Sequence, residues 1–274
     1  MSSYTKVGIY VDVENISRNG GFGMQYDILR KFVCRDGAEP VRMNAYVGFD
    51  SVRSREDEKY RERTRNFYSR IRSFGFKLIE KEVKWYHDEY GNVWGKANAD
   101  LDMAVDALLQ SENLDRVILA TGDGDFTQVV RALQNKGCRV EIVAFDNVSL
   151  DLRKETDIFV SGYLIPNLLP IKGSTKPWGE TGSQVRGLCY YYRPVEGYGY
   201  LRFLHQFGPL WITDTRDKES PYKTAYFRND AITTNSDVLY DLPSRRHIFE
   251  FTLAESDRYE DQFQAKDIAL LSRL

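Results

Sequence analysis

Short apolar runs alternate with stretches of helical hydrophobic spacing over the first part of the chain. The runs have the length of buried strands. They predict strands over residues 7–11, 42–49, 76–79, 116–120 and 139–145. Helical spacing predicts helices over residues 26–34, 55–74 and 98–110, and a fourth helix that ends near Gly137. Strands that alternate with helices are typical of a mostly parallel, three-layer α/β sheet with helices on both faces.

Two segments ahead of the fourth predicted strand have a more specific pattern. Residues 84–94 combine Trp, Tyr and Val with a Gly-Asn turn, which predicts a β-hairpin inserted before the next helix. Its aromatic side chains fit two roles, bracing the hairpin against the domain or stacking on bases. Asn98 is suited to cap the helix that follows. We expect four residues of that helix to face the core: Leu101, Ala104, Val105 and Leu108.

The pattern changes at residues 172–182, which are rich in Gly, Ser, Thr and Pro and predict a linker. Beyond them come short aromatic strands with turn residues and almost no helical spacing. Such a pattern favours a small β-barrel. We therefore predict an α/β domain over residues 1–171 and a barrel domain over residues 183–274.

Composition limits the classes of function. The chain has 38 basic and 40 acidic side chains and a net charge of -2, which excludes a protein that holds nucleic acid by bulk charge alone. Its three cysteines lack C-x-x-C spacing, so neither a disulfide framework nor a zinc site is predicted. Signal-peptide and membrane-helix patterns are absent from the sequence, and we expect a soluble protein of the reducing cytoplasm that does not enter membranes. The oligomeric state stays open, with a homo-oligomer as one alternative.

Acidic motifs follow two of the predicted strands. The segment Asp-Val-Glu-Asn, which starts at Asp12, comes after the first strand, and Thr-Gly-Asp-Gly-Asp-Phe, which contains Asp123 and Asp125, comes after the fourth. In doubly wound sheets, ligands bind outside the carboxyl ends of the strands, where the strand order reverses. If these two strands are neighbours, the three acids converge on one crevice. Asp100, in the first turn of the preceding helix, is placed to join them.

Carboxylates that share a pocket repel each other unless a cation is present. Oxygen-only ligation suits Mg²⁺ or Mn²⁺, and such an ion can activate a water molecule and orient it on a phosphodiester. The pattern therefore predicts a magnesium or manganese site. A structural alternative stays open, because an Asp after a strand often serves only as a helix cap or turn former. Likewise, Asp100, Asp102 and Asp106 fit a solvated helix face.

These motifs resemble the three signatures of the NYN/LabA-like branch of PIN-fold nucleases. They are Val11-Asp-Val-Glu-Asn15, Lys96-x-x-x-Asp100-x-x-Met-Ala-Val-Asp106 and Thr121-Gly-Asp-Gly-Asp-Phe126, within residues 4–165. The resemblance implies a Rossmann-like, PIN-type parallel sheet with a metal-dependent ribonuclease centre. It carries over, as the catalytic and metal-binding acids, Asp12, Asp100, Asp123 and Asp125. It also implies that Asn15 is a catalytic residue that orients or binds groups near these acids. Asp106 matches a recurrent acid of the family. The chain departs from the family in the segment before Asp100, where many members have a shorter Lys-Gly-x-Asp.

Alternation in the second predicted domain sorts its aromatic residues by face. Tyr198, Tyr200 and Arg202 share one face of a strand, and Tyr226 and Arg228 share a face of another. Two adjacent strands that expose Tyr and Arg would make a stacking platform for single-stranded nucleic acid. A barrel that mediates protein contacts is the alternative.

The two strand segments resemble the RNA-binding signatures of cold-shock domains, which are OB-type barrels. The resemblance covers residues 183–271 and places Tyr191 where that family has a Trp on the first strand. Departures are Glu196 for the family's Lys, Arg228 for its His and Asn229 for an aromatic residue.

A basic stripe is a further candidate for binding nucleic acid. Residues 53–72 hold eight basic and four acidic side chains, and Arg61, Arg65 and Arg72 fall on one helical stripe. A phosphate backbone could lie along it. Ion pairs on a solvated helix face explain the same pattern.

Taken together, the motifs predict a metal-dependent endoribonuclease that acts on single-stranded RNA recruited by the barrel, with DNA not excluded. The alternative function is a non-catalytic RNA-binding regulator that retains a metal-binding acidic pocket. A receiver domain would need its phosphoacceptor after the third strand and a Lys after the fifth. It is disfavoured because these strands are followed instead by Glu80-Lys-Glu82 and Asp146-Asn147. A dinucleotide-binding dehydrogenase is disfavoured because no G-x-G-x-x-G follows the first strand.

Overall fold

A computed structural model describes residues 4–97, 99–234, 236–256 and 262–274. The chain forms two compact units. The first comprises Met1–Phe22 and Leu29–Val160, and the second comprises Gly23–Ile28 and Ser161–Leu274. Asn98, the predicted cap of the helix over residues 98–110, lies outside the described residues.

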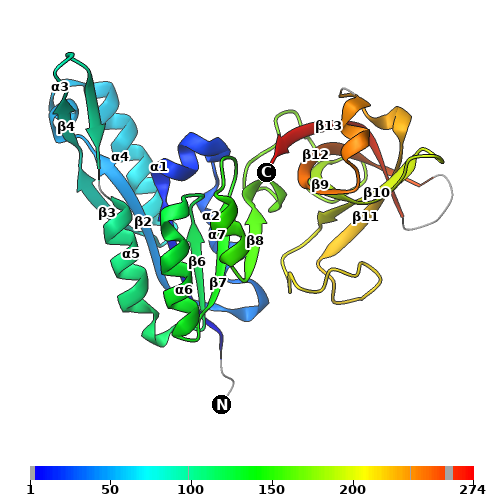
Figure 1. Ribbon diagram of the computed structural model, residues 1–274, viewed down its shortest axis with the longest axis horizontal. Helices are drawn as coiled ribbons and strands as arrows, with labels where there is room; N and C mark the ends of the chain where they lie inside the picture. The colour runs from blue at the N-terminus through cyan, green and yellow to red at the C-terminus, as the bar shows by residue number, and fades with distance from the viewer. Residues whose placement is uncertain (1–3, 98, 235, 257–261) are drawn as a thin grey trace. The chain divides into compact units, whose positions relative to one another are not determined.

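The first unit is built on a six-stranded sheet with the order β3-β2-β1-β6-β7-β8 (Figure 1). Its strands are β1 (Lys6–Asp12), β2 (Glu39–Phe49), β3 (Lys77–Glu82), β6 (Arg116–Ala120), β7 (Arg139–Ala144) and β8 (Ile158–Ser161). The pairs from β3 through β7 are parallel, and β1 lies between β2 and β6. The predicted neighbourhood of the first and fourth strands is thus confirmed. The sequence pattern missed β8, a four-residue strand with a polar end.

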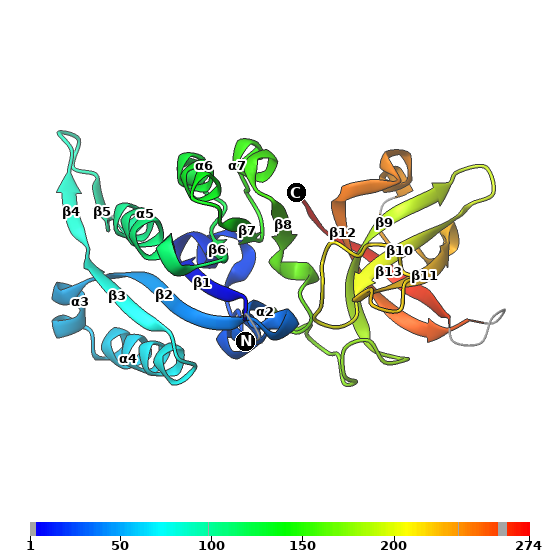
Figure 2. The ribbon, with the colours of Figure 1, turned by 90° about the horizontal axis from the view of Figure 1, so that it is seen from below.

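Helices cover both faces of this sheet, which confirms the predicted α/β class (Figure 2). They are α1 (Val13–Ile16), α2 (Tyr26–Val33), α3 (Ser51–Glu56), α4 (Glu58–Ser73), α5 (Ala99–Gln110), α6 (Thr127–Asn135) and α7 (Leu150–Glu155). Helices α5, α6 and α7 lie on one face and α2 and α4 on the other. On the first face, Met103 and Ala107 of α5 and Leu133 of α6 are fully buried in one core cluster.

Two helix predictions were wrong in detail. The helix expected over residues 55–74 is α4 and begins only at Glu58, because Asp57 has an extended backbone and its carboxylate accepts a hydrogen bond from the Tyr60 N–H at 2.9 Å, capping α4. Residues 55 and 56 belong to the end of α3. On α5, Leu101 and Val105 are 59% and 45% exposed and do not face the core. Apolar residues occur nearly all round this helix, so their spacing alone did not identify the buried side.

The predicted hairpin is present as β4 (Lys84–His87) and β5 (Val93–Lys96), paired antiparallel. It stands out beyond the end of β3, beside the start of α5 (Figure 2). Its base is joined to the sheet by a hydrogen bond of 2.9 Å from the Val83 N–H to the Phe49 carbonyl.

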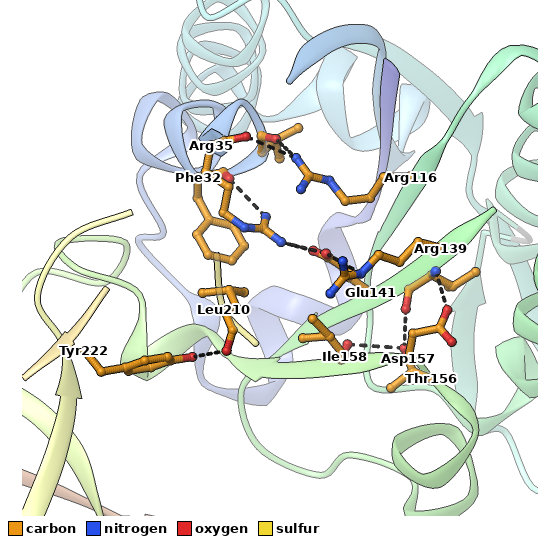
Figure 3. Close-up of polar contacts among 12 residues, drawn as sticks. Phe32, Arg35, Arg116, Arg139, Glu141, Thr156, Asp157, Ile158, Leu210 and Tyr222 are labelled. Atoms are coloured by element: carbon orange, nitrogen blue, oxygen red, sulfur yellow. Dashed lines mark hydrogen bonds and ion pairs between the residues drawn. The ribbon is translucent and has the colours of Figure 1, made fainter. Parts of the chain in front are cut away.

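A buried ion pair joins α2 to the sheet on the α2 face (Figure 3). The Arg35 guanidinium donates to the Glu141 carboxylate at 2.6 Å, and both side chains are fully buried. Arg35 also donates to the Phe32 carbonyl at 3.1 Å, and Arg116 donates to the Val33 carbonyl at 2.8 Å. These donors satisfy carbonyl groups at the end of α2, which lack partners within the helix.

The second unit contains a closed five-stranded barrel with the order β10-β11-β13-β12-β9, as the sequence predicts. Its strands are β9 (Gln184–Arg193), β10 (Tyr198–Leu204), β11 (Tyr222–Arg228), β12 (Ser244–Glu255) and β13 (Phe263–Arg273). Leu201 and Phe203 are 1% exposed and lie in its core, on the face opposite to Tyr198 and Tyr200.

Residues 172–182, expected to be a linker, are folded against this barrel. The Trp178 indole N–H donates to the Leu204 carbonyl at 2.8 Å, and the Gly182 N–H donates to the Leu253 carbonyl at 2.7 Å. Composition identified the lack of regular structure but not these contacts. Among the described residues, no helix combines the length and hydropathy that a membrane crossing requires.

Glu141→Gln is expected to lower the free energy of unfolding of the first unit by about 3 kcal/mol or more, because it leaves the Arg35 charge buried without an ionic partner. Glu155→Gln is the matched control, since Glu155 pairs with Arg131 at a partly exposed site and its loss should cost less than about 1 kcal/mol. Chemical unfolding followed by the helical circular dichroism signal measures both. Equal losses in the two variants would contradict the assignment.

Candidate functional site

The carboxyl ends of β1 and β6 border a pocket of about 330 Å³. Four acidic residues line it: Asp12, Glu14, Asp100 and Asp123. The first two come from the end of β1 and the start of α1, Asp100 from the first turn of α5, and Asp123 from the loop after β6. Segments far apart in the sequence meet here because β1 and β6 are parallel neighbours.

Asp12 is the buried acid of the pocket, with only 7% of its surface exposed. Its Oδ1 accepts a hydrogen bond from the Asn15 N–H at 3.0 Å, and its Oδ2 accepts one from the Thr121 hydroxyl at 3.4 Å. Asp12 is therefore a helix cap, as the structural alternative has it, and at the same time a wall of the pocket.

Asn15 connects the two acidic motifs. Its side-chain Oδ1 accepts a hydrogen bond from the Gly122 N–H at 2.9 Å. On the β6 side, the Asp123 N–H donates to the Thr121 hydroxyl at 3.2 Å. The Asn15 side chain thus holds the loop that carries Asp123 against the end of β1.

Electrostatics at Asp12 favour the protonated acid. Burial, the largest cause, and the charges of Asp100, Glu14 and Asp123 together raise the pKa of Asp12 from 3.8 to about 6. The hydrogen bond from the Asn15 N–H acts in the opposite direction and lowers it. A cation in the pocket would favour ionised Asp12, because it would offset the repulsion among these carboxylates.

The other acids of the predicted cluster differ in position. Asp125 is exposed and is not among the lining residues, while its N–H donates to the Asp123 carboxylate at 2.9 Å. Asp102 forms an ion pair with Lys81 at 2.7 Å. Asp106 accepts a hydrogen bond of 2.7 Å from the hydroxyl of Tyr46, which lines the pocket. The structure brings three of the four predicted acids to one pocket and leaves Asp125 outside it.

Glu14 is a lining acid that the sequence interpretation did not single out. Its carboxylate pairs with Arg18 at 3.1 Å and lies close to Gly48 on β2, where a Cβ would overlap it. The i,i+4 spacing of Glu14 and Arg18 signals this pair. Only the fold shows that the pair borders the acidic pocket.

The donor set of the pocket fits a hard divalent cation, because it offers carboxylate oxygens and no sulfur or imidazole. Within the described ranges, no three His, Cys, Asp or Glu residues are close enough to hold one ion together. Mg²⁺ needs few protein ligands, since it commonly keeps several waters and takes one or two carboxylates plus substrate phosphates. Asp12, Asp100 and Asp123 are the residues that would hold it.

Four tyrosines form a cluster on the outer face of the barrel. The ring centroid of Tyr200 lies 5.8 Å from that of Tyr191 and 5.7 Å from that of Tyr226. Tyr198 lies 5.8 Å from Tyr226. The strand register explains the cluster, because Tyr200 is opposite Tyr191 on β9 and Tyr226 on β11. We name these four residues the tyrosine platform.

A β-bulge places a fifth exposed tyrosine beside this platform, which the sequence interpretation missed. Tyr200 pairs with Tyr191, whereas Leu201 pairs with Cys189, so Tyr190 is the extra residue on β9. Consecutive strand residues normally face opposite sides. Here Tyr190 and Tyr191 are both exposed, by 41% and 37%.

The two barrel arginines of the prediction have different surroundings. The Arg202 guanidinium lies 5.7 Å from the Tyr190 ring and 5.1 Å from the Tyr222 ring, and it donates to the Thr213 carbonyl at 3.0 Å. These contacts tie the loop between β10 and β11 to the barrel. Arg228 is exposed beside Tyr198.

The basic stripe on α4 is partly an ion-paired helix face. Arg61 pairs with Glu58 at 3.5 Å, and Arg72 pairs with Glu80 at 2.7 Å. Arg65 is exposed. A role of Arg61 and Arg65 in binding nucleic acid stays a prediction.

Asp12→Asn is expected to stabilise the metal-free protein at about pH 7. Because the folded protein binds the Asp12 proton more tightly than the unfolded chain, stability is lost as the pH rises through about 6. Asn keeps the capping oxygen without the charge. The free energy of unfolding of the variant minus that of the wild type should therefore be about 2–3 kcal/mol larger at pH 7 than at pH 4. Urea unfolding at both pH values measures this. A variant with no relative gain at pH 7 would show that Asp12 is not strained by ionisation.

Three comparisons relate this chain to known proteins. The NYN domain family matches residues 6–168, which confirms the resemblance seen in the motifs. The Low amplitude and bright protein LabA of Synechococcus elongatus is 28% identical over 163 residues, 57% of this chain and 83% of that protein. The crystal structure of a protein of unknown function, VPA0982 of Vibrio parahaemolyticus, has a TM-score of 0.48 at 27% identity and covers 59% of this chain and 96% of that one. Since the family match spans more than half of the sequence, the chain belongs to the NYN domain family, whose domains are PIN-like and of the nuclease type.

Proposed function

We propose that this protein is a metal-dependent endoribonuclease that hydrolyses single-stranded RNA. The observation that carries the proposal is the buried Asp12 carboxyl group. It shares a pocket with Asp100 and Asp123 at the carboxyl ends of β1 and β6. A buried acid among like charges is costly, and such perturbed groups gather at functional sites. A cytoplasmic location, for a chain with three free cysteines, is part of this proposal.

Five of the lining residues have a role in this proposal. Asp12 and Asp123 would hold Mg²⁺ or Mn²⁺ directly or through water, and Asp100 would complete the negative wall. Bound there, the ion would supply Lewis-acid chemistry and a more acidic water. Asn15 positions the Asp123 loop through Gly122. Arg18 lies at the same pocket with most of its side chain exposed, where it can contact a substrate phosphate.

The barrel would recruit the substrate through the tyrosine platform. Every base has a face that can stack on a tyrosine ring, so such a platform binds single strands with little sequence preference. A net charge of -2 provides no general attraction for RNA, which places more weight on stacking. Arg228 and Arg193 are exposed at the edge of the platform and can contact phosphates.

Two observations support a second function. In the part of the chain that the structure describes, no three of the acids are close enough to hold one ion, and one Asp123 oxygen already accepts a hydrogen bond that caps a turn. A non-catalytic RNA-binding regulator with a metal-binding pocket fits these facts. Turnover separates the two functions.

Asp123→Asn is expected to lower the rate of RNA cleavage by about 100-fold or more, because it removes a charge from the proposed metal site. Asp125→Asn is the matched control in the same turn, and its position outside the pocket predicts a rate within about threefold of wild type. The assay uses end-labelled single-stranded RNA with Mn²⁺, and a DNA strand of the same sequence reports on sugar selectivity. If the wild type does not cut with any divalent metal, the regulator is the better description.

Replacing Tyr198, Tyr200 and Tyr226 together by Ala is expected to weaken binding of single-stranded RNA by about 100-fold, because stacking contributes roughly 1–3 kcal/mol per base. Tyr240→Ala is the control, since Tyr240 is 89% exposed and lies outside the platform. Fluorescence anisotropy at two salt concentrations measures the affinities. Binding that survives the triple substitution but disappears in moderate salt would show that phosphate contacts dominate.

A further inference from the structure

The β4–β5 hairpin places exposed aromatic side chains next to the acidic pocket. Trp85 is 50% exposed, Tyr86 44% and Tyr90 89%. Of the two roles that the sequence left open, bracing the hairpin against the domain gives the exposed part of these rings no function, whereas stacking on bases uses it. The hairpin also reaches the pocket itself, because Gly95 of β5 is one of the lining residues.

Trp85 is the exposed aromatic residue whose ring lies against that point of contact. In the hairpin register Trp85 lies directly opposite Gly95. A Cβ on Gly95 would lie only 3.2 Å from two ring carbons of Trp85, so the indole lies across the glycine. The indole therefore lies against a residue that forms part of the pocket wall.

The indole is held in place, although half of its surface is open. Its N–H donates to the Asp50 Oδ2 at 3.2 Å, and Asp50 is itself buried and caps α3 through the Arg53 N–H at 2.9 Å. This contact joins the hairpin to the end of β2. A ring fixed in this way loses little conformational freedom when a ligand stacks on it.

We infer that Trp85 is a substrate-binding residue that stacks on the base of a nucleotide whose phosphate lies in the acidic pocket. The inference rests on the proposed nuclease function and adds a contact at the centre of cleavage, separate from the tyrosine platform of the barrel. The arrangement suits a nucleotide, because the ring that would hold the base lies against a residue of the pocket that would hold the phosphate. Exposed Lys84, next to Trp85, adds a positive charge on the same strand.

The kinetic test uses the full-length protein, Mn²⁺ and a short labelled oligouridylate. Trp85→Ala should raise KM by about tenfold with kcat changed by less than about threefold, the size of one lost stacking contact. Trp85→Phe keeps a stacking face but not the indole N–H, and it should restore KM to within about threefold of wild type. Trp211→Ala is the matched control, since Trp211 is 55% exposed on the barrel unit and should leave KM for this short substrate unchanged. An unchanged KM in Trp85→Ala, or a Phe variant as poor as Ala, overturns the inference.

A second measurement does not depend on turnover. Oligouridylate carrying 5-bromouridine is irradiated with the wild-type protein and with Asp123→Asn, and the linked peptides are identified by mass spectrometry. A cross-link on the peptide that contains Trp85, lost in Trp85→Ala and retained when Tyr198, Tyr200 and Tyr226 of the platform are replaced, supports the inference. Cross-links confined to the barrel overturn it. Failure of cleavage with a Trp85 cross-link present would instead count against the proposed function alone.

Discussion

Burial of the Asp12 carboxyl group is the constraint around which this protein is organised. Asp12 ends the central strand of a parallel sheet, where little solvent reaches its charge. The Asn15 N–H and the Thr121 hydroxyl supply its hydrogen bonds, and these groups come from the two segments that follow β1 and β6. The same interactions close α1 and fix the loop that carries Asp123. The capping chemistry and the pocket are therefore one structure.

A second buried charge, on Glu141, helps to hold the sheet that carries the pocket. Glu141 of β7 is paired with Arg35 after α2, and Arg116 of β6 holds the end of the same helix. These contacts join α2 to the two strands beyond β1. Buried pairs of this kind gain little stability over apolar packing but lose much when one partner is removed. They fix the arrangement of the strands whose ends carry the acids.

Much of this fold followed from the sequence because apolar runs and helical spacing report burial directly. The central strands and the position of α6 were predictable in this way. Local hydrogen bonds account for two features that the pattern missed. Asp57 caps α4 and separates it from α3, and Trp178 attaches the predicted linker to the barrel. On α5 apolar residues lie nearly all round the helix, so their spacing could not show that Leu101 and Val105 are exposed.

The candidate site was predictable to the extent that it depends on strand order. Asp12 and Asp123 were placed together by the rule that ligands bind at the carboxyl ends of parallel strands. Glu14 and Asp125 differ from expectation because the turn after each strand decides which side chain faces the pocket. Tyr190 was missed for a related reason, since a bulge breaks the alternation that sorts strand residues by face.

The proposed nuclease function requires that Asp12 and Asp123 hold a divalent cation. A crystal structure of the protein soaked in Mn²⁺, with anomalous diffraction recorded at the manganese edge, shows whether they do. We predict an anomalous peak in the pocket, about 2.1 Å from a carboxylate oxygen of Asp12 or Asp123 or one water molecule away. A pocket without manganese, in crystals that bind the ion elsewhere, would contradict the claim.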